Sequence, residues 1–197
     1  EAMAKVLETL IARGRRSRRP KDQREVAFGL ADLSTHQELH VKMVTKGGIK
    51  SLISLLERSQ DQEAQRFSAL AIANVASTPE NRIPIVEEGV LIPLINYVNN
   101  EDGDIVGRQY SAMAIGNLAS EPENHEEVVK LEGIAALVSL LKSEDVNGGR
   151  YAAFALSNLA ANANHRAQIV EEGAPAPLVA LACAEDVDAQ RQALAAL

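Results

Sequence analysis

The sequence has no tryptophan, one cysteine (Cys183), and only three phenylalanines and three tyrosines among its 197 residues. A single cysteine cannot form an internal disulfide, so no oxidising compartment is required, and we expect a cytoplasmic protein that can also be nuclear. With so few aromatic residues, the core must consist of Leu, Ile, Val and Ala. Small aliphatic residues in this proportion favour closely packed helices.

Long apolar runs are also absent. No stretch approaches the roughly 20 residues that a membrane-spanning helix needs, and the first residues do not resemble a signal peptide, so we expect no membrane insertion. The formal net charge of −7 argues against nucleic-acid binding over the whole surface. Both ends of the sequence read as helical, so we expect a piece of a longer protein.

A segment of ten residues occurs three times in closely similar form, as SALAIANVAS (68–77), SAMAIGNLAS (111–120) and AAFALSNLAA (152–161). Its asparagines, Asn74, Asn117 and Asn158, are 43 and 41 residues apart, and Asp32 occupies the matching position 42 residues before the first. A fixed period of this length is the signature of a repeat array, in which single units cannot bury their apolar faces alone and must stack.

Each unit is predicted to contain three helices. The first is short and is expected to end at a glycine, the second is apolar with a period of 3.6 residues, and the third ends in the asparagine motif. The glycines expected to end the first helix are Gly48, Gly89, Gly133 and Gly173. Small residues recur three and five positions before the asparagine, which allows neighbouring third helices to approach closely.

The period near 42, the xNLAS motif before PEN, and EEG before an apolar helix together resemble the armadillo repeat. The resemblance covers essentially the whole chain and implies a single all-α domain, a right-handed superhelical solenoid of three-helix repeats. We expect a partial repeat over residues 1–34, repeats at about 36–77, 79–120 and 122–161, and a truncated repeat over 163–197.

The resemblance implies that the third helices line a concave groove that binds an extended segment of a partner protein. Asn74, Asn117 and Asn158 would then pair with the ligand backbone, because an amide both donates and accepts. Two further columns lie four and eight residues earlier on the same helix stripe. The column four residues earlier is expected to form the groove floor and consists of Phe28, Leu70, Met113 and Phe154. The column eight residues earlier consists of Arg24, Arg66, Gln109, Arg150 and, in the last unit, Arg191. Its arginines are expected to select the ligand.

The arginine column points to a partner bearing Asp, Glu or phosphate. Importin-α-type adaptors typically carry Trp at the floor positions, and this chain has none. We therefore expect a catenin-like scaffold rather than an importin-α-type adaptor.

Each column also has a purely structural interpretation. The asparagines can satisfy backbone groups between adjacent helices, and the arginines can pair with acidic residues of the next repeat such as Glu63 or Asp104. Asp32 departs from the asparagine pattern, and a carboxylate cannot donate to a ligand carbonyl. Both interpretations stay open at this point.

A basic segment, RGRRSRRPK at 13–21, holds six of the twenty Lys and Arg residues. It is expected to form a connection about four residues longer than those of the other units, either a solvated loop or a nuclear-localisation or acidic-surface contact, with Ser17 in a kinase-like context.

No constellation points to catalysis, a cofactor or a metal. His36 and His40 have metal-ligand spacing, but Gln37 replaces the glutamate of the zinc-protease pattern and no third ligand is near. His125 and His165 are expected at the surface where short helices start, and nothing is placed to activate Cys183.

We therefore expect a non-enzymatic protein-binding scaffold that needs no small-molecule substrate. It is expected to be a monomer, with end-to-end contacts possible at the truncated termini. Two alternatives remain. The chain can be a spacer or assembly module of a larger scaffold or ubiquitin-ligase protein, or a nuclear transport adaptor.

Overall fold

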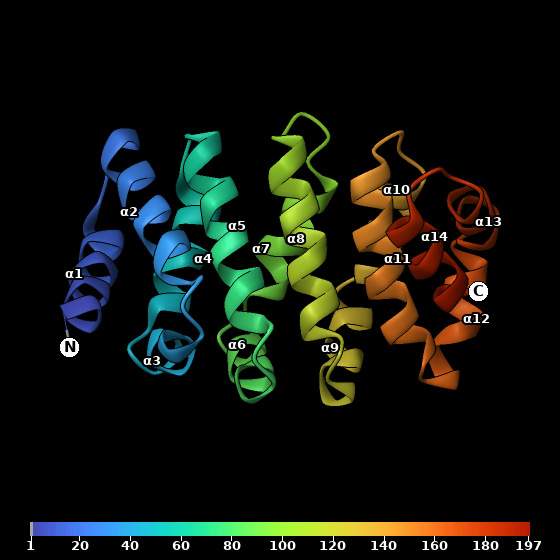
Figure 1. Ribbon diagram of the computed structural model, residues 1–197, viewed down its shortest axis with the longest axis horizontal. Helices are drawn as coiled ribbons and strands as arrows, with labels where there is room; N and C mark the ends of the chain where they lie inside the picture. Colours follow the sequence, from blue (N-terminus) through green and yellow to red (C-terminus); the bar gives the residue numbers. More distant parts are fainter. Residues whose placement is uncertain (1) are drawn as a thin grey trace.

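The computed structural model describes residues 2–197, and within them the secondary structure is helical throughout (Figure 1). The long helices are α1 (Ala2–Arg16), α2 (Pro20–Leu33), α4 (Gly48–Arg58), α5 (Gln62–Ala76), α7 (Leu91–Asn99), α8 (Ile105–Leu118), α10 (Gly133–Leu141), α11 (Val146–Ala160), α13 (Pro175–Ala182) and α14 (Val187–Ala196). The first helices of the units, which we call the short helices, are α3 (His40–Thr45), α6 (Arg82–Glu87), α9 (His125–Lys130) and α12 (Ala163–Glu171). The first three are preceded by single 3₁₀ turns, η1 (Gln37–Leu39), η2 (Pro79–Asn81) and η3 (Pro122–Asn124), and α12, with nine residues, is one residue longer than α13.

The long helices form two rows. Helices α2, α5, α8, α11 and α14 pack side by side in one row, and α1, α4, α7, α10 and α13 form the other, while the short helices lie toward one edge (Figure 1). Neighbours contact one another more extensively in the first row than in the second. Unequal spacing of this kind curves a stack toward its tighter row. The expected all-α solenoid is thus confirmed.

The sizes of the buried side chains explain why the helices of the first row pack closely. Large aliphatic side chains such as Leu52, Ile72, Leu94 and Ile115 are fully buried between the rows. Most of the small residues at the predicted columns are also buried, including Ala71, Ala114 and Ala155. Burial of each large aliphatic side chain contributes about 1.5–3 kcal/mol, and this is available only when neighbouring units stack.

The backbone at the end of each short helix differs from the prediction by one residue in two units. The left-handed conformation falls on Gly47, Gly89, Glu132 and Gly173, with φ of 77°, 82°, 62° and 85°. Gly48 and Gly133 instead begin α4 and α10. The expectation for these two glycines was therefore wrong, and Glu132 adopts a conformation that glycine would accept without strain.

The basic segment is not the long loop that the sequence suggested. Helix α1 continues through Arg16, and α2 begins at Pro20, so the connection has only three residues, as many as that between α4 and α5. The extra length is an additional turn of α1. Gly14 allows this, because a Cβ built there would lie 2.0 Å from Oγ of Ser51 in α4.

The histidines are more buried than expected. His125 and His165 are 3% and 4% exposed, which corrects their placement at the surface. His40 is also buried, and its two ring nitrogens lie 2.7 Å from Oγ1 of Thr78 and from the carbonyl oxygen of Ser34. Both nitrogens of His40 are therefore engaged within the chain.

None of the helices in residues 2–197 combines the length and apolar character required to cross a membrane.

Candidate functional site

The asparagines of the repeated motif lie near the ends of consecutive helices of the tight row. Asn74 is on α5, Asn117 on α8 and Asn158 on α11, and all three are half-buried. Equivalent positions on stacked helices form a row along one face. The sequence pattern therefore places three identical amides on the same side of the solenoid.

The donor half of each amide is used within the chain. Nδ2 of Asn117 donates to the carbonyl oxygen of Ala73 over 2.9 Å, and Nδ2 of Asn158 donates to that of Gly116 over 2.9 Å. Nδ2 of Asn74 donates instead to Oγ of Ser34. Each amide thus binds the end of the preceding third helix, where the last carbonyl groups have no hydrogen-bond partner within the helix. This geometry agrees with the structural interpretation.

The acceptor half is different. Oδ1 of Asn74, Asn117 and Asn158 makes no hydrogen bond with any other residue of the described chain. Because these side chains are half-buried rather than fully enclosed, the oxygens can accept from an N–H group of a ligand. Asp32, at the first position, is exposed and offers acceptors only.

Apolar side chains lie one turn before the amides. Leu70, Met113 and Phe154 are partly buried, whereas Phe28 is 55% exposed. The ring of Phe28 meets the edge of Phe67, with centroids 5.3 Å apart. The predicted floor residues therefore form an accessible apolar strip beside the amide row.

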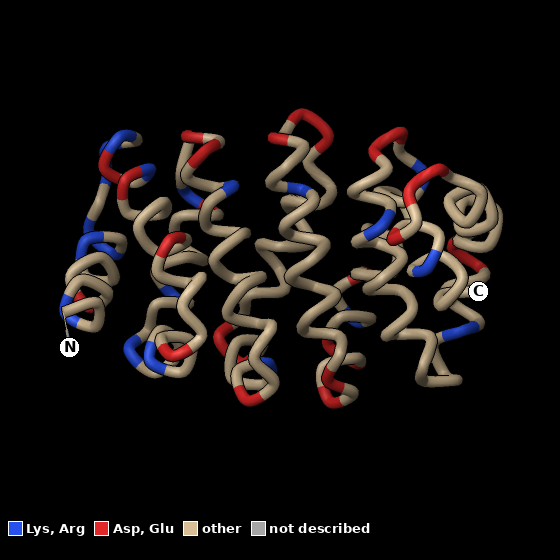
Figure 2. Tube along the Cα trace, in the orientation of Figure 1, with Lys and Arg blue, Asp and Glu red and all other residues tan. Residues whose placement is uncertain are grey.

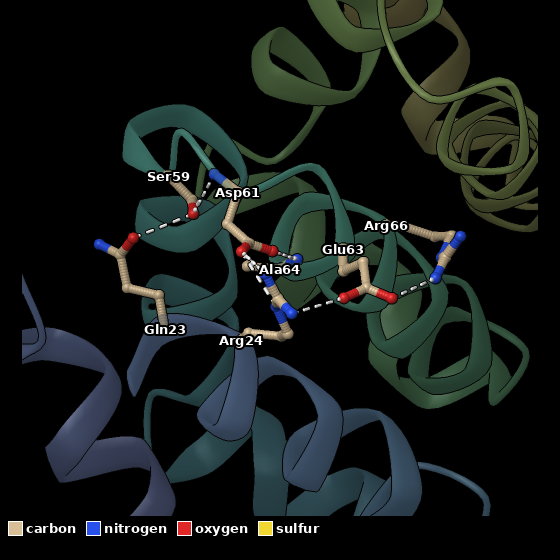
Figure 3. A network of polar contacts seen from close by, with 7 residues as sticks. All are labelled: Gln23, Arg24, Ser59, Asp61, Glu63, Ala64 and Arg66. Carbon is tan, nitrogen blue, oxygen red and sulfur yellow. Dashed lines mark hydrogen bonds and ion pairs between the residues drawn. The ribbon is translucent and has the colours of Figure 1, made fainter. Parts of the chain in front are cut away.

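Two of the predicted selector arginines are neutralised within the chain (Figure 3). Arg24 donates to Asp61, the N-cap residue of α5, and also pairs with Glu63 at 3.0 Å. The hydrogen bond from Arg24 lowers the pKa of the Asp61 carboxyl, and the same hydrogen bond raises the pKa of Arg24. Arg66 pairs with Glu63 at 3.2 Å and with Asp104, the N-cap residue of α8, at 3.6 Å.

The next position repeats the same arrangement with an amide. Nε2 of Gln109 lies 2.9 and 3.0 Å from the two carboxylate oxygens of Asp145, the residue before α11. The sequence signal for these partners is the recurrence of aspartate, at the repeat period, before α5, α8, α11 and α14. They are Asp61, Asp104, Asp145 and Asp186. Of these four, only Asp104 was predicted from the sequence as an arginine partner.

Arg150 breaks this pattern. It forms no ion pair with any residue that the structure describes, and its guanidinium group stacks over the ring of Tyr151 at 4.8 Å and donates to the tyrosine oxygen at 3.1 Å. Its Nε is screened from solvent and has no hydrogen-bond partner within residues 2–197. Arg150 thus keeps its positive charge without a carboxylate partner.

A hollow of about 320 Å³ surrounds Arg150 on this face. Its lining comes from α8, α11 and α14 and consists of Met113, Asn117, Arg150, Tyr151, Phe154, Asp188 and Gln192. Three of the predicted columns therefore meet here: an amide, two floor residues and an arginine. Arg191 is not in the lining, but it pairs at 3.4 Å with Asp188, which is, and its side chain is 71% exposed.

Comparisons with known proteins agree with this architecture. A family model described as the Armadillo/beta-catenin-like repeat matches residues 121–161. A search of curated proteins finds no match. Among solved structures, an engineered protein is 31% identical with a TM-score of 0.88, and the match covers 96% of this chain and 77% of that chain.

Two further structures resemble the chain at 24% identity, and in both the match covers 96% of this chain and 80% of the other. One is a designed armadillo repeat protein in complex with the peptide (KR)4, with a TM-score of 0.86. The other is a computationally designed armadillo repeat protein for modular peptide recognition, with a TM-score of 0.87. At this identity the likeness concerns the fold.

Proposed function

Because the chain belongs to the armadillo repeat family, we propose that it is a non-enzymatic scaffold whose tight helical row binds an extended segment of a partner protein. The observation that carries the proposal is the row of Oδ1 atoms of Asn74, Asn117 and Asn158. These oxygens have no partner within the described chain and lie beside an accessible apolar strip. A row of acceptors suits the backbone of an extended peptide, whose N–H groups recur at regular intervals.

The spacing of the row suits an extended chain. Packed helices lie about 8–10 Å apart, and an extended strand rises about 3.3 Å per residue. About two or three ligand residues therefore correspond to one repeat. The amides would supply affinity for any sequence, and Leu70, Met113 and Phe154 would each contact ligand side chains one repeat apart.

The partner segment is proposed to be acidic or phosphorylated at one position. Arg24 and Arg66 already pair with carboxylates of the chain, so they can contribute little to choosing a charged ligand. Arg150 has no such partner in the described part of the chain and lies in the hollow with Asn117 and Phe154. A ligand carboxylate or phosphate in the hollow could form charge-assisted hydrogen bonds with this guanidinium group. Of the four arginines that the sequence predicted to select the ligand, we therefore propose that Arg150 does so.

A displayed library of random linear peptides tests this proposal. We expect selected peptides to bind the intact chain, to share an Asp or Glu at one register position, and to lose affinity when Arg150 is replaced by Gln. Arg166→Gln is the matched control, because Arg166 donates to the Ala160 carbonyl and does not line the hollow. Selection of Lys- and Arg-rich peptides that ignore Arg150→Gln would contradict the acidic preference.

A triple substitution tests the amide row itself. The variant with Asn74, Asn117 and Asn158 all changed to Ala should lose affinity for every selected peptide. Its control replaces three exposed asparagines of α7, its following turn and α12, namely Asn99, Asn100 and Asn164. Equal affinities of the two triple variants would end the proposal that this face binds the ligand backbone.

A further inference from the structure

A second cavity, separate from the amide row, lies where the α1–α2 connection meets the end of α4. It has a volume of about 310 Å³. The residues of its lining that matter for its chemistry are Arg15, Ser17, Arg18, Gln23, Arg58 and Gln60. The lining contains three arginines and no aspartate or glutamate. We call it the arginine pocket.

The positive charges of the arginine pocket are not compensated within residues 2–197. Arg18 and Arg58 form no ion pair and donate no side-chain hydrogen bond, and Arg15 donates only to the backbone carbonyls of Lys46 and Gly47, at 3.4 and 3.2 Å. This contrasts with Arg24 and Arg66, whose charges are paired. Figure 2 shows basic residues gathered toward this end of a chain whose net charge is −7.

Neutral donors are also present. Oγ of Ser17 is screened from solvent and has no hydrogen-bond partner among the described residues. Arg19, the N-cap residue of α2, supplies no side-chain cap, so the positive end of the helix dipole at Pro20 faces this region without a capping side chain. The pocket thus combines cations, a hydroxyl donor and a helix N-terminus.

The wall of the pocket is held in place by a buried side chain. Nε2 of Gln23 donates to the carbonyl oxygen of Ser17 over 3.3 Å, and Oε1 of Gln23 accepts from Oγ of Ser59 over 2.9 Å. These bonds tie the α1–α2 connection to the turn after α4. Because the connection is fixed before any ligand binds, little ordering entropy opposes binding.

We propose that the arginine pocket binds a small phosphate-bearing molecule with two or more negative charges. Guanidinium groups match phosphate oxygens bidentately, and three uncompensated arginines around an acid-free cavity favour a polyanion over a single carboxylate. The volume is at the lower end of that of small-ligand sites, about 300–1,000 Å³. The proposal does not depend on the peptide-binding function of the amide row.

Pyrophosphate is the probe, and calorimetric titration of the intact chain measures its binding. The double variant Arg18→Ser with Arg58→Ser removes two pocket arginines, while Arg16→Ser with Lys21→Ser removes two charges from the same corner and changes neither the lining nor the N-cap residue of α2. We expect the first variant to bind about tenfold or more weakly, and the second to stay within about threefold of the wild type. Circular dichroism checks that both variants fold. If the Arg18→Ser with Arg58→Ser variant does not fold, Arg18→Ser alone replaces it.

Three outcomes would overturn the proposal. The wild type could fail to bind pyrophosphate at moderate ionic strength. Both variants could lose affinity equally, which would indicate a diffuse electrostatic field rather than a site. Binding could also require vesicles containing lipids with phosphorylated headgroups while soluble pyrophosphate does not bind, which would indicate a membrane-surface contact.

Discussion

Asn158 of α11 donates a hydrogen bond from Nδ2 to the backbone carbonyl of Gly116 in α8, 2.9 Å away, and Asn117 makes the same bond to Ala73 in α5. Each asparagine therefore has two sides. Its nitrogen joins one repeat to the repeat before it, and its oxygen remains open to a ligand. A residue that looks like either a structural or a binding element in the sequence can thus be both.

Replacement of Asn117 by Ala is expected to lower the free energy of unfolding by about 1 kcal/mol, because the Ala73 carbonyl loses its partner. It should also weaken peptide binding by about 1–3 kcal/mol, because the ligand loses an acceptor. Urea unfolding and peptide titration of the same variant measure the two effects. Loss of stability with unchanged affinity would assign Asn117 to repeat packing alone.

Glu132→Gly should raise the free energy of unfolding by about 1 kcal/mol, because residue 132 has a φ of 62° that glycine adopts without strain. Gly89→Ala is the converse control. A Cβ at position 89 would meet nothing within 4 Å, so its expected destabilisation of about 1 kcal/mol isolates the backbone cost. Denaturant titration gives both values, and destabilisation by Glu132→Gly would contradict the prediction.

Asp61 should contribute to stability in a pH-dependent way. Its folded-state pKa is lowered from 3.8, chiefly by the hydrogen bond from Arg24, so its contribution is complete above that pH and is lost as the pH falls through the lower folded-state pKa. Asp61→Asn should therefore be less stable than the wild type at neutral pH, and the gap should narrow in acid. Urea unfolding at a series of pH values tests this. A gap that is constant with pH would exclude the ion pair as its cause.

Tyr97 should titrate at a higher pH than an ordinary tyrosine. Burial, with the nearby Asp104 carboxylate, raises its pKa to about 12. Ultraviolet absorbance during alkaline titration should show one late transition. Gly107→Ala should disturb it, because a Cβ there would lie 2.4 Å from Cε1 of Tyr97. A single transition shared by all three tyrosines in the wild type would show that Tyr97 is not enclosed.

The fold could be predicted because the same types of residue recur at the same positions of successive repeats. Alanines such as Ala71 and Ala114 recur where third helices must touch, and Ile72 and Ile115 recur where the core must be filled. A single occurrence of either pattern would indicate only a buried helix. Recurrence at one period indicates stacking.

Features that depend on one residue of register were not predictable in the same way. The sequence cannot show that the left-handed position falls on Glu132 rather than on Gly133, because both choices end the short helix at the same place. The extra turn of α1 depends on Gly14 lying against Ser51, a contact between residues far apart in the sequence.

The sequence predicted which polar, apolar and basic residues recur on consecutive third helices, but only part of the chemistry around them. The columns of amides, floor residues and arginines were visible in the sequence, but a spacing rule does not say which charges are already compensated. Arg66 and Arg150 occupy equivalent positions, yet Arg66 pairs with carboxylates whereas Arg150 stacks on Tyr151. That difference arises from neighbouring side chains in three dimensions.

The most direct test of the amide row is a nuclear magnetic resonance titration of the labelled chain with the tightest-binding selected peptide. We predict that the side-chain amide signals of Asn74, Asn117 and Asn158 shift together with backbone signals of α5, α8 and α11. Shifts confined to the outer row, with those three side-chain signals unchanged, would contradict the account.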